Sequence, residues 1–225
     1  MTHEALWHAT NDHIRDLMEM AEDQLQSSAG QRRWRLAMCA FARRVADTAG
    51  FEAAAHVLSE VEGYIDRGIV AIGETQSVRE FETEQSMWPA PKQMTLTQAA
   101  ESSVQAAIGG AQVDPTRLFD ALYFQITEHH TSDHEQEWAT QAVIFKDIFG
   151  NPFRPVVFDQ RWRSEPTVSL ARTAYDTRNF SLLPILADAL EEAGCDHPDV
   201  LTHCRDPKQV HVRGCWVVDG VLGKV

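Results

Sequence analysis

Apolar residues recur every three to four positions along most of this chain, which is the spacing of one face of an α-helix. Glycines and capping pairs such as Asp114–Pro115 separate the apolar stripes. After a first short helix around Leu6 and Trp7, the pattern predicts helices over roughly residues 14–25, 31–48, 51–66, 95–108, 115–126, 132–149, 166–175, 181–193 and 197–204.

Few segments favour an extended conformation. Two segments are candidate short strands, IVAI at 69–72 and VVFD at 156–159. The prolines of NPFRP exclude a helix over residues 151–155. The SSAG segment at 27–30 is expected to end a helix. We therefore expect a mainly α fold of stacked helical hairpins or an irregular bundle, with at most short peripheral strands. WPAP suggests a linker at 67–94 between helical subdomains 1–66 and 95–225, unless the chain is one continuous domain.

The composition of the chain restricts the cellular compartment and the classes of partner that we expect for it. The 225 residues are 44% hydrophobic and carry a formal charge of −13, which disfavours nucleic acid as a partner. The arginine-rich segment RRWRLAMCAFARR reads better as a solvated helix face than as a phosphate-binding surface. No apolar run is long enough to span a bilayer, and no signal peptide is visible at the N-terminus. Four unevenly spaced cysteines suit a reducing cytoplasm.

Three phrases of the second half, NPFRPV, LLPILADALEEAGC and HVRGCWVVDGVLGK, resemble an uncharacterised bacterial family of cytosolic helical proteins that carry GNPFRPV, PILADALEEAGC and HVRGCW segments. The stretch RRWRLAMCAFARRVADTAG is similar to that family's second helix. The resemblance covers roughly residues 10–50 and 140–225. It implies a helical cytosolic protein and no particular activity. Family members tend to pair cysteines in the second helix, where this chain has only Cys39.

The densest group of metal-capable side chains lies near the C-terminus. Thiolate sulfur and imidazole nitrogen are the ligands that tetrahedral zinc prefers. The candidate zinc ligands are Cys195, His203, Cys204, His211 and Cys215. His203 and Cys204 are adjacent on a helix, so only one of them is expected to reach the same ion. The alternative interpretation, which we favour from sequence alone, is that these residues pack in the core without a cofactor.

A second histidine-rich segment, HHTSDHEQEW at 129–138, offers His130 and His134 four residues apart. The HExxH pattern of zinc proteases fails there, because Trp138 stands where the second histidine is needed. A capping box formed by Ser132 and Glu135 also places a helix start between the two histidines. Structural roles are therefore favoured in this segment.

Arginines near the prolines and near the C-terminus form a third candidate site. Arg154 stands between two prolines, which hold its planar guanidinium on a stiff backbone suited to a carboxylate. Together with His211 and Arg213 it would make an anion or nucleotide site if the three converge in space. The ordinary alternative is an internal salt bridge from Arg154.

Catalytic signatures are missing. The chain has no G-x-S-x-G, P-loop or G-x-G-x-x-G sequence. We therefore expect a non-catalytic module that binds another protein. A metal-dependent enzyme or zinc-stabilised domain is the alternative, followed by an anion binder built on Arg154 and Arg213.

Overall fold

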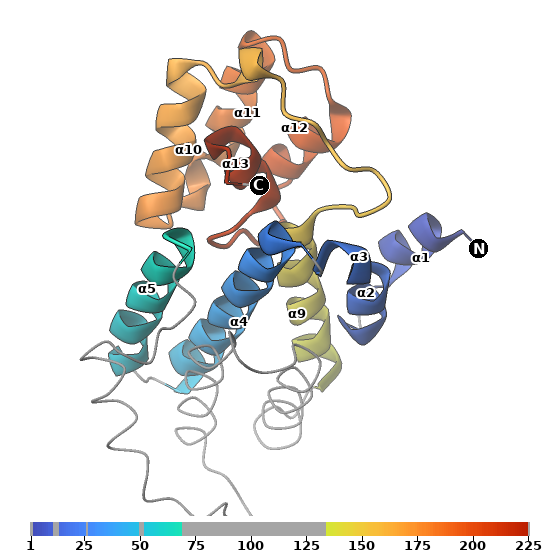
Figure 1. Ribbon diagram of the computed structural model, residues 1–225, viewed down its shortest axis with the longest axis vertical. Helices are drawn as coiled ribbons and strands as arrows, with labels where there is room; N and C mark the ends of the chain where they lie inside the picture. The colour runs from blue at the N-terminus through green and yellow to red at the C-terminus, as the bar shows by residue number, and fades with distance from the viewer. Residues whose placement is uncertain (1, 11–13, 26, 50–51, 69–133, 225) are drawn as a thin grey trace, which may run out of the picture. The chain divides into compact units, whose positions relative to one another are not determined.

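The computed structural model describes residues 2–10, 14–25, 27–49, 52–68 and 134–224 (Figure 1). Within these ranges every regular element is a helix and no strand is present, so the predicted mainly α fold is confirmed. The extended segment 156–159 forms no ladder there. The predicted helices over 95–108 and 115–126, the IVAI segment and nearly all of the expected linker lie outside the described residues.

The chain divides into two compact units. One contains Met1–Arg33 and Ala139–Val225, and the other contains Trp34–Trp138. Helices α4 (Ser28–Ala49) and α9 (His134–Phe149) each cross from one unit into the other. The subdomain boundaries expected from the sequence stay a prediction.

The second unit is built on α4 and α5 (Glu52–Asp66). Their apolar stripes are buried as the sequence pattern predicts, with Trp34, Met38, Phe41, Ala54, Leu58 and Val61 each at most 3% exposed. Arg43 lies 3.4 Å from both Glu62 and Ser59, which ties the two helices together.

The N-terminal segment corrects two predicted boundaries. It forms α1 (His3–Ala9), α2 (Ile14–Met20) and α3 (Glu22–Leu25), so the helix expected over 14–25 is interrupted at Ala21. The SSAG segment begins α4 and does not end a helix. The reason is the Ser27 hydroxyl, which accepts a hydrogen bond of 2.9 Å from the Gly30 N–H and so caps the first turn.

The C-terminal half of the first unit contains η1 (Gln160–Trp162), α10 (Glu165–Thr177), η2 (Phe180–Leu182), α11 (Leu183–Glu192), α12 (Pro198–Arg205) and α13 (Trp216–Leu222). Helix α10 packs against α11 and α13, and α12 packs against the same two helices (Figure 1). Leu183, Leu186, Val200 and Val218 are fully buried in this core. None of the described helices is both long and apolar enough to cross a membrane.

Candidate metal centre

Four side chains of the first unit bring candidate metal ligands to one point: Asp147, His203, His211 and Cys215. Asp147 lies in the last turn of α9, just before Gly150 ends the helix with a φ of +64°. His203 lies in the last turn of α12 and His211 in the loop that follows. Cys215 is the N-cap residue immediately before α13. The cluster therefore joins three separate parts of the fold.

The distances within the cluster are short. Nε2 of His203 lies 3.1 Å from Oδ1 of Asp147 and 3.2 Å from Sγ of Cys215. Nδ1 of His211 lies 2.7 Å from the same Oδ1 and 3.9 Å from the same Sγ. All four ligand atoms fall within 4.8 Å of one another.

One feature distinguishes this arrangement from a Cys–His–Asp relay. In a relay the imidazole uses one ring nitrogen for the nucleophile and the other for the carboxylate. Here a single nitrogen of His203 faces both Asp147 and Cys215, and a single nitrogen of His211 does the same. Two imidazoles therefore face the same oxygen and the same sulfur, an arrangement that ligands around a shared ion also adopt.

Asp147 is fully buried, and its two carboxylate oxygens have different partners. Oδ2 accepts a hydrogen bond of 2.8 Å from the Val212 N–H, while Oδ1 faces both histidines. Burial disfavours the charge, but the hydrogen bonds from His203 and His211 outweigh it and hold the pKa of the carboxyl below its usual value. Asp147 is therefore an ionised carboxylate with one oxygen oriented toward the cluster.

The Cys215 thiol is also fully buried. Burial and the nearby Asp147 carboxylate raise its pKa well above the usual value, so the thiol is poorly suited to act as a free nucleophile. A divalent cation would reverse this effect on the pKa of the thiol, because a thiol that coordinates a metal loses its proton. One carboxylate, one thiolate and two neutral imidazoles would then carry two negative charges, which a divalent ion neutralises.

The set of ligand atoms fits zinc. Bonds of about 2.0–2.3 Å in a tetrahedron separate neighbouring ligand atoms by about 3.2–3.8 Å. Four of the ligand-atom separations are 2.7, 3.1, 3.2 and 3.9 Å, and all separations lie within 4.8 Å, so the side chains would have to shift to form a regular tetrahedron. Nitrogen, sulfur and carboxylate oxygen together are ligands that zinc accepts.

The structure separates the residues predicted as zinc ligands into two groups. His203, His211 and Cys215 meet at the cluster. All three cysteines belong to the apolar core of α10–α13, but Cys195 and Cys204, which are 2% and 1% exposed, are not among the four residues of the cluster. Burial raises the pKa of Cys195 and, with the Asp147 carboxylate, raises that of Cys204 to about 12, as expected for cysteines that fill space.

Asp147 was missed by the sequence reasoning. It belongs to FKDIFG, far from the cysteine-rich end, and no ligand spacing connects it to the histidines. One indication was present. Asp147 lies between Ile144 and Ile148 on the apolar stripe of its helix, and a charged residue on a buried stripe requires a partner.

The three residues predicted to form an anion site contact different groups. Arg154 lies 3.6 Å from Glu4 and 3.6 Å from Asp199, which is the internal salt bridge considered as its alternative role. The guanidinium of Arg213 stacks over the Tyr175 ring at 4.4 Å. His211 faces Asp147.

In the histidine-rich segment, His129, His130 and Ser132 lie outside the described residues. His134 is the first residue of α9. The structural roles expected for this segment stay a prediction.

Comparison of the chain with protein-family models, with curated proteins and with solved structures gives no match. The family resemblance drawn from the sequence phrases stays a hypothesis.

Proposed function

We propose that this chain is a metal-stabilised helical domain that holds one zinc ion through Asp147, His203, His211 and Cys215. The observation that supports this is the convergence of one nitrogen from each imidazole on the space between Oδ1 of Asp147 and Sγ of Cys215. Hydrogen bonding alone does not require both rings to point at the same pair of atoms.

The role proposed for the ion is structural. Four protein ligands complete a tetrahedron, whereas catalytic zinc sites keep a position for water or substrate. The side chains of His203 and His211 are 11% and 6% exposed, and those of Asp147 and Cys215 are not exposed at all. The ion would cross-link α9, α12 and the start of α13. The protein-interaction role favoured by the sequence stays a separate prediction.

Elemental analysis of the purified chain tests the proposal, with Cys215→Ser as the variant and Cys204→Ser as its matched control. Both substitutions remove a buried thiol from the same half of the first unit, but only Cys215 faces the histidines. We expect about one zinc per chain in the wild type and in Cys204→Ser, and a large loss in Cys215→Ser.

Cobalt substitution gives an independent readout. Co²⁺ in this site should show a thiolate-to-cobalt charge-transfer band that Cys215→Ser abolishes and Cys204→Ser retains. Wild-type protein that binds neither zinc nor cobalt after reconstitution would falsify the proposal. Equal metal content in both serine variants would also exclude these four ligands.

A further inference from the structure

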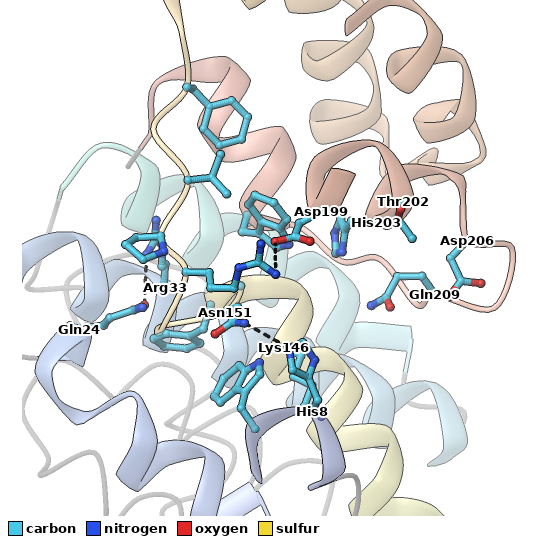
Figure 2. Close-up of a pocket in the computed structure, with 18 residues that line it drawn as sticks. His8, Gln24, Arg33, Lys146, Asn151, Asp199, Thr202, His203, Asp206 and Gln209 are labelled. Atoms are coloured by element: carbon cyan, nitrogen blue, oxygen red, sulfur yellow. Dashed lines mark hydrogen bonds and ion pairs between the residues drawn. The ribbon is translucent and has the colours of Figure 1, made fainter. Parts of the chain in front are cut away.

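A pocket of about 430 Å³ opens in the first unit beside the candidate metal centre (Figure 2). His203 forms part of its wall, and Figure 2 shows Arg33 with Gln24 on one side and His203 with Thr202 on another. Its apolar wall is largely aromatic and includes Trp7, Phe149, Phe158 and Trp216 beside Pro155 and Val156. The volume lies within the range of small-ligand sites, about 300–1,000 Å³.

Positive charge exceeds negative charge in the lining. The cations are Arg33, Lys146 and Arg154, and the acids are Asp199 and Asp206. Arg154 is paired with Asp199 at 3.6 Å and with Glu4 outside the pocket. Asp206 is exposed and accepts a hydrogen bond of 2.9 Å from the Lys208 N–H. An excess of positive charge in a chain of net charge −13 indicates a local preference for anions.

Arg33 is the cation in this lining that lacks a counter-ion. Its nearest polar contact is the neutral Oε1 of Gln24, at 3.5 Å, and no carboxylate forms an ion pair with it in the described part of the chain. Asp219 acts on Arg33 only through space, because that carboxylate is bound by the neighbouring Arg32. Burial lowers the pKa of Arg33, which reflects the cost of a charge that is partly removed from water.

Lys146 adds a second half-buried cation to the same pocket. Its Nζ donates to the Thr10 carbonyl at 2.6 Å and lies 6.0 Å from the Trp7 ring centroid. Burial lowers its pKa as well. Lys146 therefore adds a second, partly desolvated positive charge to the lining of the pocket.

We propose that this pocket binds a small organic anion, whose carboxylate or phosphate group contacts Arg33 and whose apolar body packs on the aromatic wall, while Lys146 adds positive charge to the same lining. The planar guanidinium suits either oxyanion, and the ring faces suit a flat apolar group. The proposal does not depend on the metal. It also differs from the anion site expected from the sequence, since Arg154 is engaged by acids and Arg213 lies outside the lining.

Titration calorimetry on the full chain tests this with benzoate, phenyl phosphate and inorganic phosphate, and with benzyl alcohol as the neutral control. We expect saturable binding of benzoate or phenyl phosphate and none of benzyl alcohol. Tighter binding of phenyl phosphate would identify a phosphate ligand, and tighter binding of benzoate a carboxylate. Inorganic phosphate binding more weakly than phenyl phosphate would show that the aromatic wall contributes.

Arg33→Gln is the diagnostic variant and Arg172→Gln its control, because Arg172 is exposed on α10 and outside the pocket. Both remove one positive charge, but only Arg33→Gln should weaken anion binding, by at least about tenfold. The metal content of both variants is also measured, so that a loss of metal is distinguished from a loss of anion binding. If Arg33→Gln fails to fold, Lys146→Gln serves as the second variant. Unchanged affinity in the folded variant, or no saturable anion binding below about 10 mM in the wild type, overturns the inference.

Discussion

The Val212 N–H donates a hydrogen bond of 2.8 Å to Oδ2 of Asp147, linking the loop before α13 to the last turn of α9. This bond fixes the carboxylate so that Oδ1 is presented to His203 and His211. Backbone hydrogen bonds of this kind orient metal-ligating carboxylates and are insensitive to the side chain at the donor position. Asp147 is therefore positioned by the fold itself.

Asp147→Asn preserves the shape of this side chain and removes its charge. We expect metal affinity to fall by more than about 100-fold, because the variant loses a ligand and not merely an orienting contact. We also expect stability to fall by about 3 kcal/mol, since the two histidines lose their buried partner. Competition with a chelator measures the first effect and urea unfolding the second. Wild-type affinity in Asp147→Asn would contradict the assignment of this ligand.

Gly150→Ala should disturb the candidate metal centre through Trp216. The glycine has a φ of +64°, and an added Cβ would lie 3.2 Å from Cγ of Trp216, whose ring is 5.1 Å from that of His203. Gly194→Ala is the control, because Gly194 has a φ of +87° and nothing within 4 Å of its added Cβ. In both variants the free energy of unfolding should fall by about 1–2 kcal/mol, because alanine is strained in this backbone conformation. Only Gly150→Ala should also weaken cobalt binding, as measured by titration of the charge-transfer band.

Gly220→Ala should destabilise the C-terminal core. An added Cβ would overlap Cε2 of the Phe158 ring, so the ring must move and its packing is lost. We expect a loss of about 1–3 kcal/mol in urea unfolding. At Gly63 in α5 the nearest atom would be 3.5 Å away, and alanine there should stabilise by about 0.5–1 kcal/mol. Equal effects at the two glycines would show that Phe158 is not packed as described.

Arg32→Leu tests whether the Arg32 guanidinium stabilises the negative charge of Asp219, which is fully buried. Removing the guanidinium leaves that carboxylate without its main counter-ion, so we expect a loss of about 3–5 kcal/mol. Asp219→Leu added to Arg32→Leu should recover part of that loss, because the uncompensated charge is then gone. A double-mutant cycle in urea measures the coupling. Additive effects would show that the two residues do not interact.

Acid titration of Asp159 should reveal an ion pair at the surface. Hydrogen bonds from the Arg161 side chain and backbone lower the pKa of Asp159 from 3.8 to about 2. Because the folded pKa is the lower one, the stabilisation is present above pH 3.8 and is lost as the pH falls toward 2. Carboxyl NMR shifts report this pKa directly, and Arg161→Gln should move it back toward 3.8. A midpoint near 3.8 in the wild type would rule out the pair.

The helical character was predictable because it depends on local periodicity, and the stripes of α4 and α5 are buried as expected. The start of α4 was not, because Ser27 acts as a cap through a hydrogen bond that SSAG does not reveal. At the cluster, residue chemistry pointed to His203, His211 and Cys215. The sequence could not show that Cys204 lies outside the cluster or that Asp147 belongs to it. Both facts depend on which side chains of α9 and α12 meet in the folded chain.

The burial of the cluster has a consequence for the timing of metal uptake. Cys215 is the N-cap residue of α13, and both it and Asp147 are wholly buried. Since two of the four ligands are wholly buried, release of an ion held there would require this part of the unit to open locally, and exchange would be as slow as that opening. The supply of zinc during synthesis, more than the affinity of the finished protein, would then decide how many copies mature with the ion in place.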